Sequence, residues 1–170
     1  ALGPLLMPYD PYLPELALRL QGPSLAHPFG TDEVGRDILT RIAYGARFSL
    51  LMGVVAMSIA ACIGVPLGLQ AGYRSGWSDI AIMRGVDVMM TLPSIVLAIA
   101  IVSVLGAGVT SVVIAVGITS TPAFARLTRA VALTLREQDF VAAARVVGAS
   151  DLRILRRHIL PNSLPPIIVQ

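Results

Sequence analysis

The chain alternates between charged stretches and long runs without charge. No charged residue occurs in the 26 positions 48–73 or in the 38 positions 88–125. A membrane-spanning helix needs about 20 apolar residues, so the first run accommodates one span and the second nearly two, with a turn at Gly106–Gly108. The pattern therefore predicts membrane spans at about 48–70, 80–105 and 110–132.

Residues 1–47 have a different pattern, with six of the twelve prolines and scattered charges. Proline removes a helical hydrogen bond, so we predict an irregular external segment over 1–47. It should end in a short helix, capped by Thr31 or Asp32, that leads to the membrane. Because the chain starts at Ala1 and ends in an apolar stretch, we interpret it as a piece of a longer protein, truncated at both ends.

Composition argues against an ordinary cytosolic enzyme. Hydrophobic residues make up 55% and charged residues 14%, with a mean hydropathy of +0.78, whereas soluble domains carry about 25% charged residues. All 13 basic residues are arginine, which excludes chemistry that needs a lysine within this chain. The single cysteine, Cys62, has apolar neighbours, and we expect it to be buried and inert.

The arginines predict the orientation of the spans. Seven arginines and three acidic residues lie between positions 126 and 157, whereas residues 1–47 carry four arginines and five acidic residues. The positive-inside rule places the segment after the third span in the cytoplasm. Three crossings then place residues 1–47 outside the cell.

Small residues and prolines interrupt the apolar runs. Gly64, Gly68 and Gly72 recur every four residues, so they line one helix face and favour close contact with another helix. Prolines at 66, 93 and 122 should bend or interrupt the spans, as packing features or as hinges. Arg84 and Asp87 are three residues apart and are predicted to pair at the inner membrane edge.

The segment 30–37 has the spacing of a phosphate-binding loop but lacks its chemistry. Arg36 replaces the required lysine, and Asp37 replaces the hydroxyl that would bind magnesium. Two further acidic residues would repel phosphate. We therefore predict a structural role for this loop and no nucleotide site.

Residues 139–161 predict a small helix–turn–helix between membrane spans. A helix starts at Asp139, and Gly148 is suited to the left-handed conformation that ends it. One apolar face of this helix contains Phe140, Ala143, Ala144 and Val147. Ser150 and Asp151 start a second helix, which should stop at Pro161. Its arginines also fit DNA binding, but docking of a cytoplasmic protein is the favoured interpretation.

This helix–turn–helix resembles the EAA loop of permease subunits in binding-protein-dependent ABC importers. The matching positions are Ala143, Ala144, Gly148, Leu160 and Pro161, while Ala142 replaces the family's glutamate and His158 its isoleucine. The sequence from His158 to Asn162 is similar to the dipeptide, oligopeptide and nickel branch, C-type permease. Further similarities to that branch lie at Gly30, Thr31, Asp32, Gly35, Arg36 and Asp37, at Gly45–Arg47 with Ser49–Leu50, and at Ala71–Tyr73.

The resemblance implies an all-α, polytopic membrane helix bundle with the ABC importer type I permease fold, in the bacterial inner membrane. Residues 48–170 would form its permease domain, with a cytoplasmic loop at about 136–160 and the next span from about 161. The subunit would form half of a translocation pathway and would not itself be an enzyme. Its implied partners are a second permease, two cytoplasmic ATPases that bind ATP and magnesium, an external solute-binding protein and membrane lipid. Phe140, Ala143, Ala144, Val147 and Gly148 would contact an ATPase.

Two other classes remain as alternatives. A secondary transporter usually carries ionisable residues in mid-membrane, and the charge-free runs of this chain argue against that class. A membrane-tethered regulator would need a base-reading helix that is free of the bilayer. With two distant histidines and one cysteine, we expect no metal site and no cofactor in this chain. The solute is not readable from the sequence, although peptides are the default and nickel or another small solute is an alternative.

Overall fold

The computed structural model describes residues 8–170, so the first seven residues of the predicted external segment lie outside the described part. The chain divides into two compact units, residues 1–54 and 55–170. We call them the first and the second unit. Helix α1 (Ile38–Arg74) contributes residues to both.

The first unit is mostly irregular before α1. It contains a short 3-10 helix, η2 (Leu16–Leu18), and an antiparallel bridge between Thr31 and Asp37. The predicted cap at Thr31 or Asp32 is wrong, because Asp37 caps α1: its Oδ2 accepts the backbone N–H of Thr40 at 2.7 Å. The predicted short helix is therefore the first part of α1 itself.

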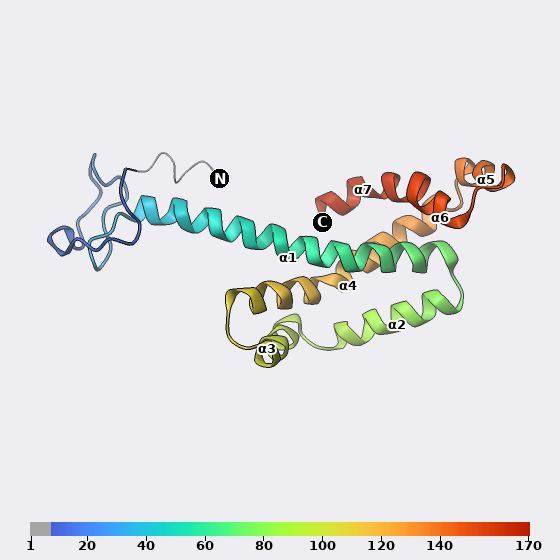
Figure 1. Ribbon diagram of the computed structural model, residues 1–170, viewed down its shortest axis with the longest axis horizontal. Helices are drawn as coiled ribbons and strands as arrows, with labels where there is room; N and C mark the ends of the chain where they lie inside the picture. The colour runs from blue at the N-terminus through green and yellow to red at the C-terminus, as the bar shows by residue number, and fades with distance from the viewer. Residues whose placement is uncertain (1–7) are drawn as a thin grey trace. The chain divides into compact units, whose positions relative to one another are not determined.

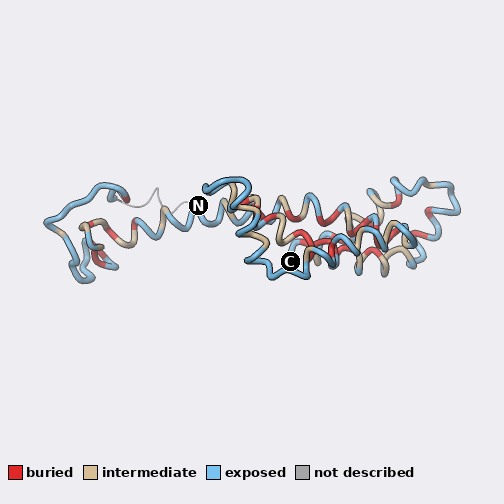
Figure 2. Tube along the Cα trace, turned by 90° about the horizontal axis from the view of Figure 1, so that it is seen from below, coloured by how far each residue is buried: buried red, intermediate tan, exposed pale blue. Residues whose placement is uncertain are grey.

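The second unit is a bundle of helices (Figure 1). After α1 the chain forms α2 (Trp77–Thr91), α3 (Ser94–Leu105), α4 (Val109–Leu135) and α5 (Asp139–Val146), and then a continuous helical segment of α6 (Asp151–Ile154), the π-helical η3 (Leu155–Ile159) and α7 (Leu160–Val169). Buried positions concentrate where the helices face one another (Figure 2). Cys62, predicted to be buried, is exposed on α1.

Two helices, α1 and α4, are long and apolar enough to cross a membrane. The pair α2 and α3 meets the same criterion only as a broken span, bent by 91°. Leu92 between them is extended, with φ −93° and ψ 138°, as expected for a residue before proline. The predicted span at 80–105 is therefore two helices that meet at Pro93, where an interruption was predicted, and the predicted all-α membrane-helix fold is confirmed.

The other prolines do not end their helices. Pro66 lies inside α1 and Pro122 lies inside α4. Pro161, predicted to stop a helix, instead follows the π-helical turn η3 and sits in the first turn of α7. Proline cannot donate to the preceding turn and clashes with its carbonyl, and a π-helical turn is one way in which a helix accommodates such a residue.

Candidate functional site

The three glycines at positions 64, 68 and 72 lie together where α1 contacts α4. A Cβ atom at Gly68 would stand 2.4 Å from the Ala125 carbonyl oxygen and 2.7 Å from the Thr128 Cβ. At Gly64 and Gly72 the nearest α4 atoms would be only 2.7 Å and 2.6 Å away. The two backbones therefore approach so closely that only glycine fits, and this contact lies within one chain.

Two charged pairs link α4 to α2. Arg129 binds both carboxylate oxygens of Asp79 on α2, each at 2.6 Å, and Arg126 binds Asp87 at 2.6 Å. The predicted pair of Arg84 with Asp87 is therefore wrong. Arg126 on the facing helix takes the carboxylate instead, a partner that local spacing could not indicate.

Helix α5 ends just before Gly148, which adopts the left-handed conformation that the sequence predicted. Gly148 has φ +79°, in the left-handed region. The Ala149 N–H donates to the Ala144 carbonyl at 3.0 Å, and the Gly148 N–H donates to that of Arg145 at 3.0 Å. This pair of bonds is the Schellman motif, which fixes the direction in which the chain leaves α5.

The residues of the predicted docking face divide into two groups. Phe140, Ala143, Val147 and Gly148 are exposed. Ala144 is instead buried in the hydrophobic core of the second unit, so the prediction that it shares the outward face is wrong. Val141, which the prediction omitted, is completely buried beside it. The three-residue spacing of Val141 and Ala144 is the signal that would have identified the inward face.

Side chains from α1, α6 and η3 hold α5 in place. The Tyr73 hydroxyl donates to Asp151 Oδ1 at 2.8 Å, and the Arg145 guanidinium lies 5.4 Å from the centre of the Tyr73 ring, within range of a cation–π contact. The Phe140 and His158 rings are 6.2 Å apart between centroids. These contacts fix the position of α5 and therefore the direction of its exposed face.

In the first unit, the motif at 30–37 forms a closed turn around Asp32. Its Oδ1 accepts the N–H groups of Val34 and Arg36, both at 3.0 Å, and its Oδ2 binds the guanidinium groups of Arg36 and Arg41. Desolvation acts to raise the pKa of Asp32, but these hydrogen bonds outweigh it and hold that pKa well below its usual value. The motif therefore has a structural explanation without phosphate.

The two glycines of this motif also have defined roles. Gly30 and Gly35 have φ of +73° and +81°. A Cβ atom at Gly35 would stand 1.8 Å from the Glu15 carbonyl oxygen, so no larger residue fits there. Thr31 and Asp37 complete the motif as the partners of the antiparallel bridge. Among residues 8–170 no cluster of three potential metal ligands occurs.

Residues 64–170 match the family model described as "Binding-protein-dependent transport system inner membrane component". The dipeptide transport system permease protein DppC of Alkalihalophilus pseudofirmus is 53% identical over 89% of this chain and 50% of its own length. The glutathione transport system permease protein GsiD is 55% identical in Escherichia coli, over 87% of this chain and 49% of its own length. In Pectobacterium atrosepticum it is 48% identical over 96% and 55%.

The chain spans about half the length of these curated relatives. The family match covers more than half of the chain, and it includes the α1–α4 glycine contact, the charged pairs and α5. The chain therefore belongs to the family of binding-protein-dependent transport system inner membrane components.

Proposed function

We propose that this chain is part of a permease subunit that forms half of the translocation pathway of an ATP-driven importer for peptides or a similar small solute. The observation that carries the proposal is the identity of 53% and 55% to relatives named for dipeptide and glutathione transport. Both solutes are short peptides with free carboxylates. A peptide-like solute is therefore the class that best fits the comparisons.

The complete transporter would contain four kinds of partner. These are a second permease subunit, two cytoplasmic ATPases, an external solute-binding protein and the surrounding lipid. ATP and magnesium would be bound by the ATPases and not by this chain. The excess of arginine after α4 supports a cytoplasmic position for α5 and an external position for the first unit.

Within this assembly, the outward face of α5 would contact an ATPase. Phe140 and Ala143 on α5 and Val147 at its C-cap are exposed apolar residues, and exposed apolar groups of this kind mark protein contacts. Val141 and Ala144 hold the opposite face in the core. A displacement of α5 by the ATPase would therefore be passed directly to the packed helices.

The substitution Ala143→Glu in the full-length subunit of the assembled transporter tests this proposal. Ala143 is exposed, so the variant should fold and insert normally. In the complex it would bury an unpaired carboxylate, at a cost of several kcal/mol. We expect loss of ATPase co-purification and of solute uptake, while the external binding protein still docks.

Ala142→Glu is the matched control. Ala142 is the neighbouring exposed alanine and occupies the position where the family pattern carries glutamate, so this variant should retain ATPase association and uptake. If Ala143→Glu behaves like Ala142→Glu in both assays, α5 is not the coupling element.

A further inference from the structure

A groove that the proposed transport function does not use lies between the end of α1 and the α6–η3 segment. Its cavity measures about 290 Å³. Leu69 of α1, Leu155 of η3 and Leu160 at the start of α7 line it with apolar side chains, and Arg74 and Arg156 line it as well. The groove thus combines an apolar wall with basic side chains contributed by two different elements.

The two arginines have no carboxylate partner within residues 8–170, and both are exposed. Asp151 also lines the groove, but its Oδ1 accepts the Tyr73 hydroxyl. Two positive charges therefore face one carboxylate that is already hydrogen-bonded. An anion is the ligand that this excess of charge attracts.

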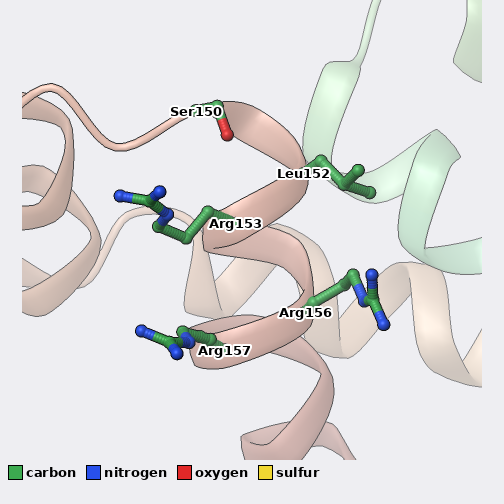
Figure 3. Close-up of a pocket in the computed structure, with 5 residues that line it drawn as sticks. All are labelled: Ser150, Leu152, Arg153, Arg156 and Arg157. Atoms are coloured by element: carbon green, nitrogen blue, oxygen red, sulfur yellow. The ribbon is translucent and has the colours of Figure 1, made fainter.

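Arg153, Arg156 and Arg157 of the α6–η3 segment line a neighbouring pocket together with Ser150 and Leu152, but of these arginines only Arg156 also lines the groove. Figure 3 shows Arg156 and Leu152 extending from one side of the helical segment, while Arg153 and Arg157 extend from the other. Arg156 and Leu152 are also the ones that line the groove beside α1. This division separates a groove pair, Arg74 and Arg156, from a control pair, Arg153 and Arg157, of the same residue type.

We propose that the groove binds an anionic phospholipid, with the phosphate headgroup between Arg74 and Arg156 and an acyl chain along the three leucines. The guanidinium fork matches phosphate geometry, and basic pockets between membrane helices are suited to acidic lipid headgroups. A free phosphate ion would use the charges but leave the apolar wall exposed to water. An acyl chain covers that wall, which is why a lipid fits both parts of the groove.

The inference rests on the membrane location that the family establishes and is independent of the proposed solute and ATPase contacts. Its readout is lipid binding rather than uptake. A failure of the transport proposal would therefore leave it intact, and the reverse also holds.

The test is native mass spectrometry of the complete transporter, titrated with phosphatidylglycerol or phosphatidylcholine. We expect wild type to retain phosphatidylglycerol preferentially. The double variant Arg74→Gln, Arg156→Gln should bind it about tenfold more weakly or worse, since each basic residue near an anionic surface contributes appreciably to binding. Binding of phosphatidylcholine should not change.

Three controls decide the outcome. The double variant Arg153→Gln, Arg157→Gln should retain phosphatidylglycerol, and millimolar inorganic phosphate should not displace the lipid. Leu155→Asn should weaken lipid binding although it leaves both arginines in place. Equal lipid loss in the two double variants would show a diffuse charge effect and overturn the site. Loss of ATPase subunits without loss of lipid would assign the groove to a protein partner instead.

Discussion

The interiors of the two units differ in kind: buried polar side chains stabilise the first unit, and an apolar core stabilises the second. In the first unit, the buried side chains of the described residues 8–54 include His27, Thr31, Asp37 and Thr40, and none of the buried hydrophobic residues lies there. In the second unit the core is apolar and includes Ala60, Phe124, Ala132, Val141, Ala144, Ile154 and Ile159.

The difference arises because the two units gain different amounts of free energy from burying apolar surface. The proline-rich segment leaves large apolar side chains such as Leu13, Leu16 and Phe29 exposed, and it relies on turns closed by side-chain hydrogen bonds. Membrane helices gain little from burying apolar surface against one another, because lipid is equally apolar, and rely on close approach of small residues.

The largest expected effect comes from Gly68→Ala in the α1–α4 contact. The added methyl group would stand 2.4 Å from a backbone oxygen of α4, which a side-chain rotation cannot relieve. We expect destabilisation of about 3 kcal/mol, because the helices must separate. Denaturant unfolding in detergent, followed by circular dichroism, measures it.

Gly85→Ala is the matched control, since a Cβ atom there meets nothing within 4 Å. Gly85 lies in α2, where replacing glycine by alanine should be neutral or stabilise the helix by up to about 1 kcal/mol. Equal destabilisation by the two substitutions would refute the close-contact explanation.

This contrast also shows what sequence could predict. The four-residue glycine spacing correctly placed Gly64, Gly68 and Gly72 on one face, because helix periodicity alone fixes which residues share a face. It did not identify α4 as the contacting helix, since the partner depends on how the chain folds back. The left-handed Gly148 was predictable for the same local reason.

Prolines and charges were harder to predict. The same residue type breaks the helix at Pro93, lies within a helix at Pro122, and follows a π-helical turn at Pro161. The outcome depends on the surrounding packing, which local sequence does not contain. Asp87 likewise pairs across helices with Arg126 rather than locally with Arg84. In the first unit, the cap fell on Asp37 because the turn around Asp32 already uses Thr31 and Asp32.

Ion pairs between helices are also expected to stabilise the apolar second unit. Arg129→Gln removes the partner of Asp79, whose side chain is only 14% exposed. We expect a loss of about 2 kcal/mol, below the 3–5 kcal/mol of a fully buried pair, because Arg129 itself is partly exposed. The same unfolding experiment on the isolated chain measures it.

Arg126→Gln provides the comparison on the same helix. The side chains of Arg126 and Asp87 are both 49% exposed, and such pairs contribute about 0–1 kcal/mol. The first variant should therefore unfold at clearly lower denaturant than the second. Similar midpoints for the two variants would mean that exposure does not determine the strength of these pairs.

The smallest expected effect is local and lies in the first unit, with Asp37→Ala. This change removes the cap of α1 and the 3.1 Å contact between Asp37 Oδ1 and His27 Nδ1. A lost cap costs about 1 kcal/mol, so trypsin should cleave after Arg19 about fivefold faster through local opening. The unfolding midpoint of the second unit should not move. Asp10→Ala, which removes an exposed carboxylate, should leave the cleavage rate unchanged.

Acid should reproduce the effect of that substitution. Desolvation acts to raise the pKa of Asp37, but hydrogen bonds from Thr40 and His27 outweigh it, so the pKa lies below its ordinary value of 3.8. Folding therefore favours the ionised form of Asp37. The stability that the ionised Asp37 contributes is fully present above pH 3.8 and is lost as the pH falls through the lower pKa of the folded state. Amide hydrogen exchange of the segment 27–41, corrected for intrinsic rates, should therefore remain slow down to about pH 4 and accelerate below it. In Asp37→Ala the same amides should exchange faster at neutral pH and show a weaker acid dependence, the remainder coming from Asp32. An unchanged pH profile in the variant would mean that Asp37 does not hold the first unit together.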